Sequence, residues 1–135
     1  MNIQLSYNEL ETFIQKKYHQ QIALTFGDEH TVNMSKSFNM FIRQKTVNIA
    51  ISILKVEDND IVLTYHAGLG LDLMLQGALA WFKDSVGDLL EHPEGTNRLI
   101  IHLAKVKQLE KVLSVVMIQD IKFDEGGVHA MVGMK

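Results

Sequence analysis

The sequence predicts an α+β domain with a strongly curved antiparallel sheet of six or seven strands wrapped over a long helix, plus an N-terminal helix. Residues 71–90 carry apolar side chains at helical spacing, which predicts the long helix. Shorter segments with alternating apolar side chains predict strands elsewhere. Every connection between these strands is compatible with antiparallel pairing. No linker or internal repeat divides the chain, so we expect one domain over residues 1–135.

The N-terminal helix is predicted by a capping-box pattern, in which Ser6 is followed three residues later by Glu9. The apolar residues that follow at helical spacing are Leu10, Phe13, Ile14 and Tyr18. This pattern predicts a helix over residues 7–19. Residues 21–26 then read as a short strand, and residues 27–30 read as a turn.

A hairpin in the middle of the chain is the most clearly marked element. Residues 32–42 form one long predicted strand, and residues 47–54 are apolar on both faces. A strand that is apolar on both faces is usually covered on both faces. The polar residues 57–60 predict a turn, and residues 61–65 predict the returning strand.

The predicted long helix has one wide apolar stripe. Its members are Leu71, Met74, Leu75, Ala78, Trp81, Phe82, Val86, Leu89 and Leu90. The sequence His-Pro-Glu-Gly at residues 92–95 ends this helix. A strand over residues 99–103, a helical turn over 109–113 and a closing hairpin over 118–134 follow. Gly126 and Gly127 suit the positive φ angles of the closing turn.

The composition excludes several classes of protein. A formal charge of −3 and a pI near 6.0 argue against binding nucleic acid through a broad basic face. The absence of cysteine excludes disulfides, thiolate metal ligands and cysteine nucleophiles. The first residues lack the pattern of a signal peptide, and no stretch reaches the roughly 18 apolar residues of a membrane helix. We therefore expect a cytoplasmic protein with no transmembrane segment and no cofactor.

Few polar residues point to chemistry. The glycine-rich turn of residues 66–72, which contains His66 and Asp72, lacks the spacing of both the dinucleotide-binding loop and the P-loop. A tight turn is its simpler interpretation. His102 and His129 lie in predicted strands that can pair, but no histidines have the i, i+4 spacing of a helical zinc motif. We expect neither a metal site nor a catalytic residue.

The last third of the chain resembles a known family. Its apolar pattern consists of Leu109, Val112, Leu113, Val116, Ile118, Ile121 and Phe123, with Asp120 among them and Gly126, Gly127 and Val128 after them. This pattern is similar to the closing segment of tubular lipid-binding (BPI-like) domains, and the opening helix is also similar. The resemblance implies a long helix wrapped by a bent antiparallel sheet, with acyl chains held between them.

Three functions stay open. The first is binding of a hydrophobic, lipid-like small molecule in an apolar cavity between helix and sheet, lined by Phe13, Met74, Trp81 and Phe82. The second is a non-catalytic, homo-oligomeric scaffold, such as a homodimer formed through the apolar strand at residues 47–54. The third is a small enzyme acting at the turn of residues 66–72. No residue set identifies a reaction, so we favour a binding protein over an enzyme.

Overall fold

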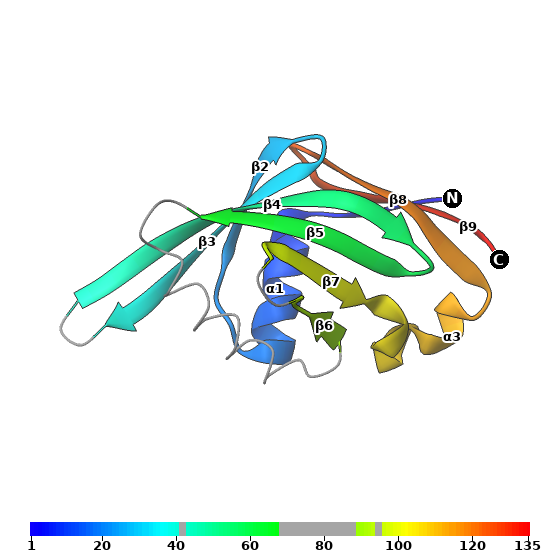
Figure 1. The fold of residues 1–135 in the computed structure, drawn as a ribbon, viewed down its shortest axis with the longest axis horizontal. Coiled ribbons are helices and arrows are strands. Elements are labelled where there is room, and N and C mark those ends of the chain that lie inside the picture. Colours follow the sequence, from blue (N-terminus) through cyan, green and yellow to red (C-terminus); the bar gives the residue numbers. More distant parts are fainter. Residues whose placement is uncertain (41–42, 68–88, 94–95) are drawn as a thin grey trace.

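The computed structural model describes residues 1–40, 43–67, 89–93 and 96–135 (Figure 1). The strands are β1 (Asn2–Leu5), β2 (Ala23–Asp28), β3 (Thr31–Met40), β4 (Arg43–Glu57), β5 (Asp60–Ala67), β6 (Leu90–Glu91), β7 (Arg98–His102), β8 (Val116–Asp124) and β9 (Gly127–Met134). The helical segments are α1 (Tyr7–Tyr18), the 3-10 turns η2 (Leu103–Lys105) and η3 (Lys107–Leu109), and α3 (Glu110–Leu113). In these ranges the protein is mostly antiparallel sheet.

The larger sheet has six strands in the order β2-β3-β4-β5-β7-β6. The β4–β5 hairpin confirms the predicted central hairpin, and Asp58 and Asn59 turn it with φ angles of 52° and 65°. Two consecutive residues with positive φ match the right-handed twist of the strands that they join. Over residues 49–52 β4 pairs with both β3 and β5, so it is an interior strand there.

The smaller sheet has three strands in the order β1-β9-β8. The β8–β9 hairpin confirms the predicted closing hairpin, and Gly127 has a φ of 147°. The Asp124 side chain accepts hydrogen bonds from the backbone nitrogens of Gly126 (2.7 Å) and Gly127 (3.0 Å), which stabilises this turn. β1, which the sequence patterns did not predict, pairs with β9 more than 120 residues away along the chain.

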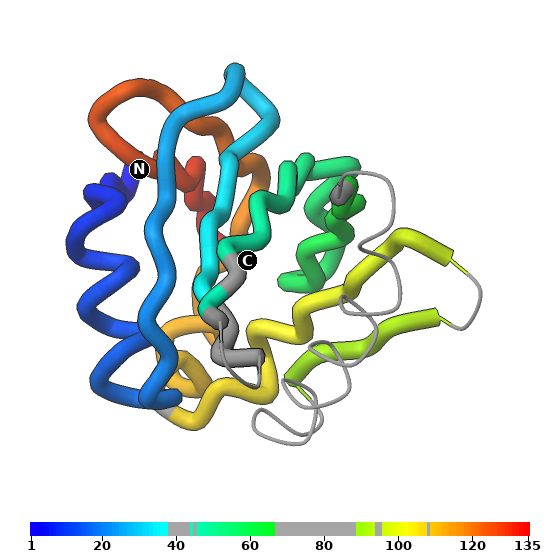
Figure 2. The backbone as a smooth tube through the Cα atoms, turned by 90° about the vertical axis from the view of Figure 1, so that its left-hand side faces the viewer, coloured from blue at the N-terminus to red at the C-terminus, as the bar shows by residue number. Residues whose placement is uncertain are grey.

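Helix α1 confirms the predicted N-terminal helix. The Ser6 hydroxyl oxygen accepts from the Glu9 nitrogen, and the Glu9 carboxylate accepts from the Ser6 nitrogen, both at 3.1 Å. His19 ends the helix in the left-handed conformation, with its nitrogen donating to the Gln15 carbonyl. Figure 2 shows α1 alongside β2, and the Leu24 nitrogen of β2 donates to the Glu11 carboxylate of α1 at 2.9 Å.

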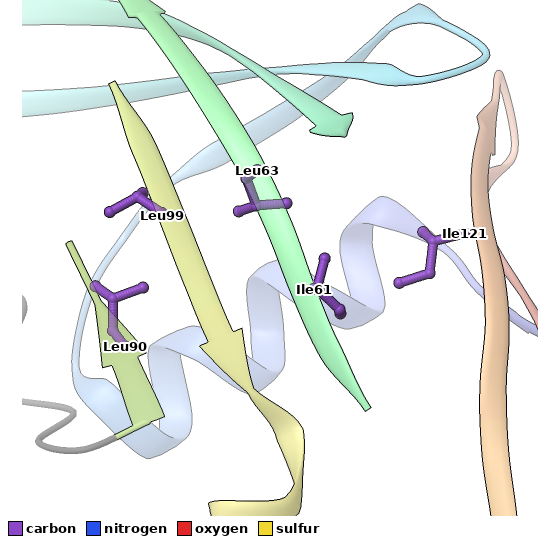
Figure 3. Packing of buried hydrophobic residues seen from close by; sticks show 5 residues of the cluster. All are labelled: Ile61, Leu63, Leu90, Leu99 and Ile121. Atoms are coloured by element: carbon purple, nitrogen blue, oxygen red, sulfur yellow. The ribbon is translucent and has the colours of Figure 1, made fainter. Parts of the chain in front are cut away.

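One hydrophobic cluster joins the two sheets (Figure 3). Its buried members are Ile61, Leu63, Leu90, Leu99 and Ile121. They come from β5, β6 and β7 of the larger sheet and from β8 of the smaller sheet, and Val128 and Ala130 of β9 pack against them. Burial of each large aliphatic side chain contributes about 1.5–3 kcal/mol, so the cluster stabilises the packing of the two sheets against each other.

The predicted fold class is wrong. The strands form two open sheets instead of one strongly curved sheet, and no long helix is present in the ranges that the structure describes. Leu90, predicted as the last residue of the long helix, lies in β6 opposite Ile101. An apolar run of this kind predicts burial, but periodicity alone does not separate a helix end from a short strand. Residues 71–88 of that predicted helix lie outside the described residues.

The helix-in-sheet arrangement implied by the resemblance to tubular lipid-binding domains is therefore not seen in the described ranges. Within the same ranges, no helix has the length and apolar character needed to cross a membrane.

Candidate functional site

The predicted ligand-lining residue Phe13 lies on α1 with 50% of its surface exposed. Its ring meets the ring of Tyr18 edge-on, with centroids 6.4 Å apart. Leu10 and Ile14 lie on the same side of the helix and are half-buried. These residues form an apolar stripe, which we call the α1 stripe: Leu10, Phe13, Ile14 and Tyr18.

Two polar contacts hold α1 against the strands. The Tyr7 hydroxyl donates to the backbone carbonyl of Asp124 at 2.5 Å, which fixes the first turn to the end of β8. Burial, followed by the nearby Asp124 charge, raises the pKa of Tyr7. One turn further on, Glu11 accepts from Leu24 of β2. The helix is therefore anchored by hydrogen bonds instead of by deep apolar packing.

The α1 stripe contributes little to the core of the described residues. No residue of α1 is buried, and none belongs to the hydrophobic cluster or packs directly against it. An amphipathic helix normally buries its apolar face. The other predicted lining residues, Met74, Trp81 and Phe82, lie outside the described residues, so the structure places only Phe13 of the predicted set.

A second polar cluster surrounds His102 at the end of β7. Its Nδ1 lies 2.8 Å from Asp60 Oδ1 of β5, and its Nε2 lies 3.2 Å from Glu91 Oε2 of β6. An ionised carboxylate only accepts hydrogen bonds, so both ring nitrogens donate when the imidazole is protonated. The cluster joins three adjacent strands and leaves neither ring nitrogen free to act as a base.

A third cluster pairs His129 of β9 with Asp124 at the end of β8. The Nε2 atom of His129 makes a short contact with Asp124 Oδ2. Partial burial raises the pKa of the Asp124 carboxyl, but hydrogen bonds from the Gly126 nitrogen and from His129 outweigh this effect and lower that pKa overall. The carboxylate thus closes the hairpin turn and orients the imidazole. A structural role accounts for all of these contacts.

His102 and His129, which lie in strands that the sequence allowed to pair, do not come together. The two residues lie in different sheets, on β7 and β9. In the described part of the chain, no three side chains of histidine, aspartate or glutamate come together as a metal site. His66 lies exposed near the end of β5, whereas Asp72 and residues 68–71 of the glycine-rich turn lie outside the described residues.

Sequence reasoning missed the partners of His102 and His129. The sequence patterns place Asp60 in the turn of residues 57–60 and indicate no contact between any carboxylate and these two histidines. The register of the antiparallel strands brings each carboxylate to its histidine; Asp60, for example, lies opposite His102. The register depends on which strands pair, and local sequence patterns do not predict the strand pairing.

Comparisons with protein-family models, with curated proteins and with solved structures find no match to this chain. The geometry of the described residues is therefore the basis for a functional assignment.

Proposed function

We propose that this chain is a non-catalytic binding domain that takes up a hydrophobic, lipid-like ligand along the α1 stripe. The observation that carries the proposal is an amphipathic helix of 12 residues with no buried residue. Its exposed apolar member is Phe13, an aromatic side chain that offers a large apolar surface. A ligand that covers this surface gains about 25 cal/mol for each Å² of apolar area removed from water.

The polar clusters support binding over catalysis. His102 and His129 are each engaged by carboxylates, and both arrangements join neighbouring strands. The anchors at Tyr7 and Glu11 are four residues apart and lie on the side of α1 that carries Ile14 and Tyr18, so that side faces the strands. Phe13 lies off that side and is 50% exposed, so a ligand can cover its ring without loss of the contacts that position the helix.

Fluorescence of Trp81 and of an added apolar dye tests the proposal, with fatty acids of increasing chain length as competitors. We expect saturable binding that tightens with chain length, because each added methylene contributes about 0.8 kcal/mol when buried. The variant Phe13→Ser is expected to weaken binding by about tenfold, equivalent to about 1.4 kcal/mol.

The matched control is Leu54→Ser, because Leu54 has the same 50% exposure but lies on β4. This variant is expected to bind like the wild type. If no fatty acid of any chain length gives a saturable fluorescence response, ligand binding is contradicted. Equal weakening by both substitutions contradicts the location of the site on α1.

A further inference from the structure

The outer edge of β1 is unlike the other sheet edges in the described ranges. At the edge of β8, the Phe123 nitrogen donates to the Glu29 carbonyl and the Ile118 nitrogen donates to the Asn59 side chain. At the edge of β2, Leu24 donates to Glu11, and β6 has only two residues. Natural edge strands are usually protected by such covering, shortening or charge.

β1 has neither the covering nor the charge that protects such edges. Its sequence, Asn-Ile-Gln-Leu, has no charged residue and no proline, and all four residues are exposed. Ile3 and Leu5 are 43% and 40% exposed, and the preceding Met1 is 77% exposed. An exposed, uncharged edge with apolar side chains is a template for pairing with another strand.

The direction of the free backbone groups follows from the pairing with β9. The Met1 nitrogen donates to the Val132 carbonyl, and the Val132 nitrogen donates to the Met1 carbonyl, so these residues form a hydrogen-bonded pair. Such pairs alternate along an antiparallel ladder. Ile3 and Leu5 therefore also bond to β9, and the N–H and C=O groups of Asn2 and Gln4 point to the open edge.

We propose that β1 pairs with β1 of a second copy of this chain, antiparallel, around a two-fold axis that passes through Ile3. In this register Asn2 and the partner's Gln4 form a hydrogen-bonded pair, and the symmetric pair forms on the other side of the axis. All four outward backbone groups are then bonded, giving four intermolecular hydrogen bonds. The two small sheets become one continuous sheet of six strands.

The side chains suit the same register. Ile3 lies opposite the partner's Ile3, and Met1 lies opposite the partner's Leu5, so all three apolar side chains meet apolar partners. On the other face, Asn2 meets the partner's Gln4, and neither carries a charge. A two-fold contact requires the surface to be complementary to itself, and this edge meets that requirement.

An alternative two-fold axis through Gln4 gives hydrogen bonds to fewer of the outward backbone groups. It places Asn2 opposite the partner's Ser6, but the Ser6 nitrogen already donates to Glu9 and its carbonyl accepts from Leu10. Only the two hydrogen bonds between the Gln4 residues would form. The capping box of α1 thus selects the axis through Ile3. This interface does not depend on the proposed ligand site.

A single cysteine tests both the contact and its register, because the chain has no other cysteine. In the proposed dimer the two Ile3 residues form a non-hydrogen-bonded pair, whose Cα atoms lie about 4.5 Å apart, within the range of a disulfide. The two Leu5 positions lie about 13 Å apart along the strands, too far to be bridged. In a mild thiol–disulfide buffer, Ile3→Cys is expected to form a linked dimer at least about tenfold faster than Leu5→Cys.

Three results overturn the proposal. The first is equally slow linkage of both variants, and the second is faster linkage of Gln4→Cys than of Ile3→Cys, which would place the axis at Gln4. The third is a wild-type mass in sedimentation equilibrium that stays monomeric over the whole concentration series. Circular dichroism of each variant verifies that it is folded.

A charge-pair experiment tests the contact without a covalent bond. Ile3→Lys and Ile3→Glu are each expected to sediment as monomers, because like charges then lie directly opposite each other. An equimolar mixture is expected to restore the dimer as a mixed species. Failure of the mixture to associate contradicts the pairing of Ile3 with the partner's Ile3. Leu54→Lys, on β4, is the control and is expected to dimerise like the wild type.

Discussion

The side-chain oxygen of Asn59, in the β4–β5 turn, lies 3.1 Å from the backbone nitrogen of Ile118 in β8. Asn59 is 4% exposed, and its own carbonyl accepts from the Leu103 nitrogen at 3.1 Å. One residue thus bonds to the edge of the smaller sheet and to the chain that leaves the larger sheet. A polar side chain buried to this extent is retained because its hydrogen bonds are made.

Asn59→Ala is expected to destabilise the protein by about 2–4 kcal/mol. It leaves the Ile118 nitrogen unpaired at a partly buried position, and the loss of such a hydrogen bond costs about 1–3 kcal/mol. It also places alanine at a φ of 65°, which costs about 1–2 kcal/mol. Asn59→Gly removes the hydrogen bond without the backbone strain and is expected to cost about 1 kcal/mol less. Urea unfolding measures both values, and equal losses for the two variants contradict the contribution of strain.

Gly127→Ala is expected to destabilise the protein more than Gly126→Ala. An added Cβ at Gly127 would lie 2.1 Å from the Leu5 carbonyl oxygen, at a φ that side chains rarely adopt. At Gly126 the nearest atom is the flexible Asp124 carboxylate, at 3.3 Å. We expect a loss of about 3 kcal/mol or more for the first variant and below about 1 kcal/mol for the second. Thermal unfolding of both variants measures the two losses of stability. Similar losses for the two variants contradict the close approach of β1 to this turn.

Acid is expected to weaken the contact between the β2–β3 turn and β8. Glu29 and Lys122 form an ion pair with a distance of 3.0 Å, and the hydrogen bond and charge of Lys122 lower the pKa of Glu29 below its ordinary value of 4.5. The folded pKa lies below the unfolded pKa, so this stabilisation is present above pH 4.5 and is lost as the pH falls through the folded pKa. Stability measured against pH should therefore decline on the acid side.

Lys122→Met is expected to make that acid decline shallower, because Glu29 then titrates closer to its ordinary value in the folded state. Lys55→Met is the control, since Lys55 pairs with Glu57 within the same strand. High salt is expected to reduce the wild-type effect, because both partners are exposed. If stability falls with acid in Lys122→Met as steeply as in the wild type, the role of this ion pair is contradicted.

Tyr7→Phe is expected to cost about 1 kcal/mol at neutral pH through loss of the hydrogen bond to Asp124. Burial and the Asp124 charge raise the pKa of Tyr7 above its ordinary value of 10.0. The stabilisation is therefore complete below pH 10.0 and is lost as the pH rises through the folded pKa. The stability difference between wild type and variant should shrink in that window. A difference that stays constant there contradicts the coupling.

Several elements could be predicted from the sequence because their signals are local. The capping box of Ser6 and Glu9 marks the start of α1, and the Gly126–Gly127 pair marks the β8–β9 turn. The alternating strands around residues 57–60 predict the β4–β5 hairpin. In each case the residues that form the element lie within a few positions of one another.

The predicted dimer surface at residues 47–54 illustrates the opposite case. Two-sided apolar character indicates a strand covered on both faces, yet Leu54 of β4 is 50% exposed. Both edges of β4 are occupied at residues 49–52, where it pairs with β3 and with β5. The strand that is open at its outer edge is β1, whose four residues are too short a pattern to be recognised. Exposure of an edge depends on the strand order of the whole sheet.

Phe13 illustrates what the sequence predicted of the candidate site. Helical spacing places it on the apolar side of α1, and it lies there. Its 50% exposure was not predictable, because exposure depends on how closely the strands approach the helix. The contacts of His102 with Asp60 and Glu91 depend in the same way on strand register.

The sequence by itself determined the capped helix α1, the two hairpins and their turns, because capping groups, alternation and glycine conformations act between near neighbours. Only the tertiary structure decided that β1 pairs with β9, that Leu90 belongs to a strand, and that Asn59 is buried between the sheets. These features join residues from about ten to more than a hundred positions apart. Their stabilising free energy comes from burial and from strand pairing, which form after the chain has folded back on itself. Local sequence patterns do not determine which strands pair or in which register.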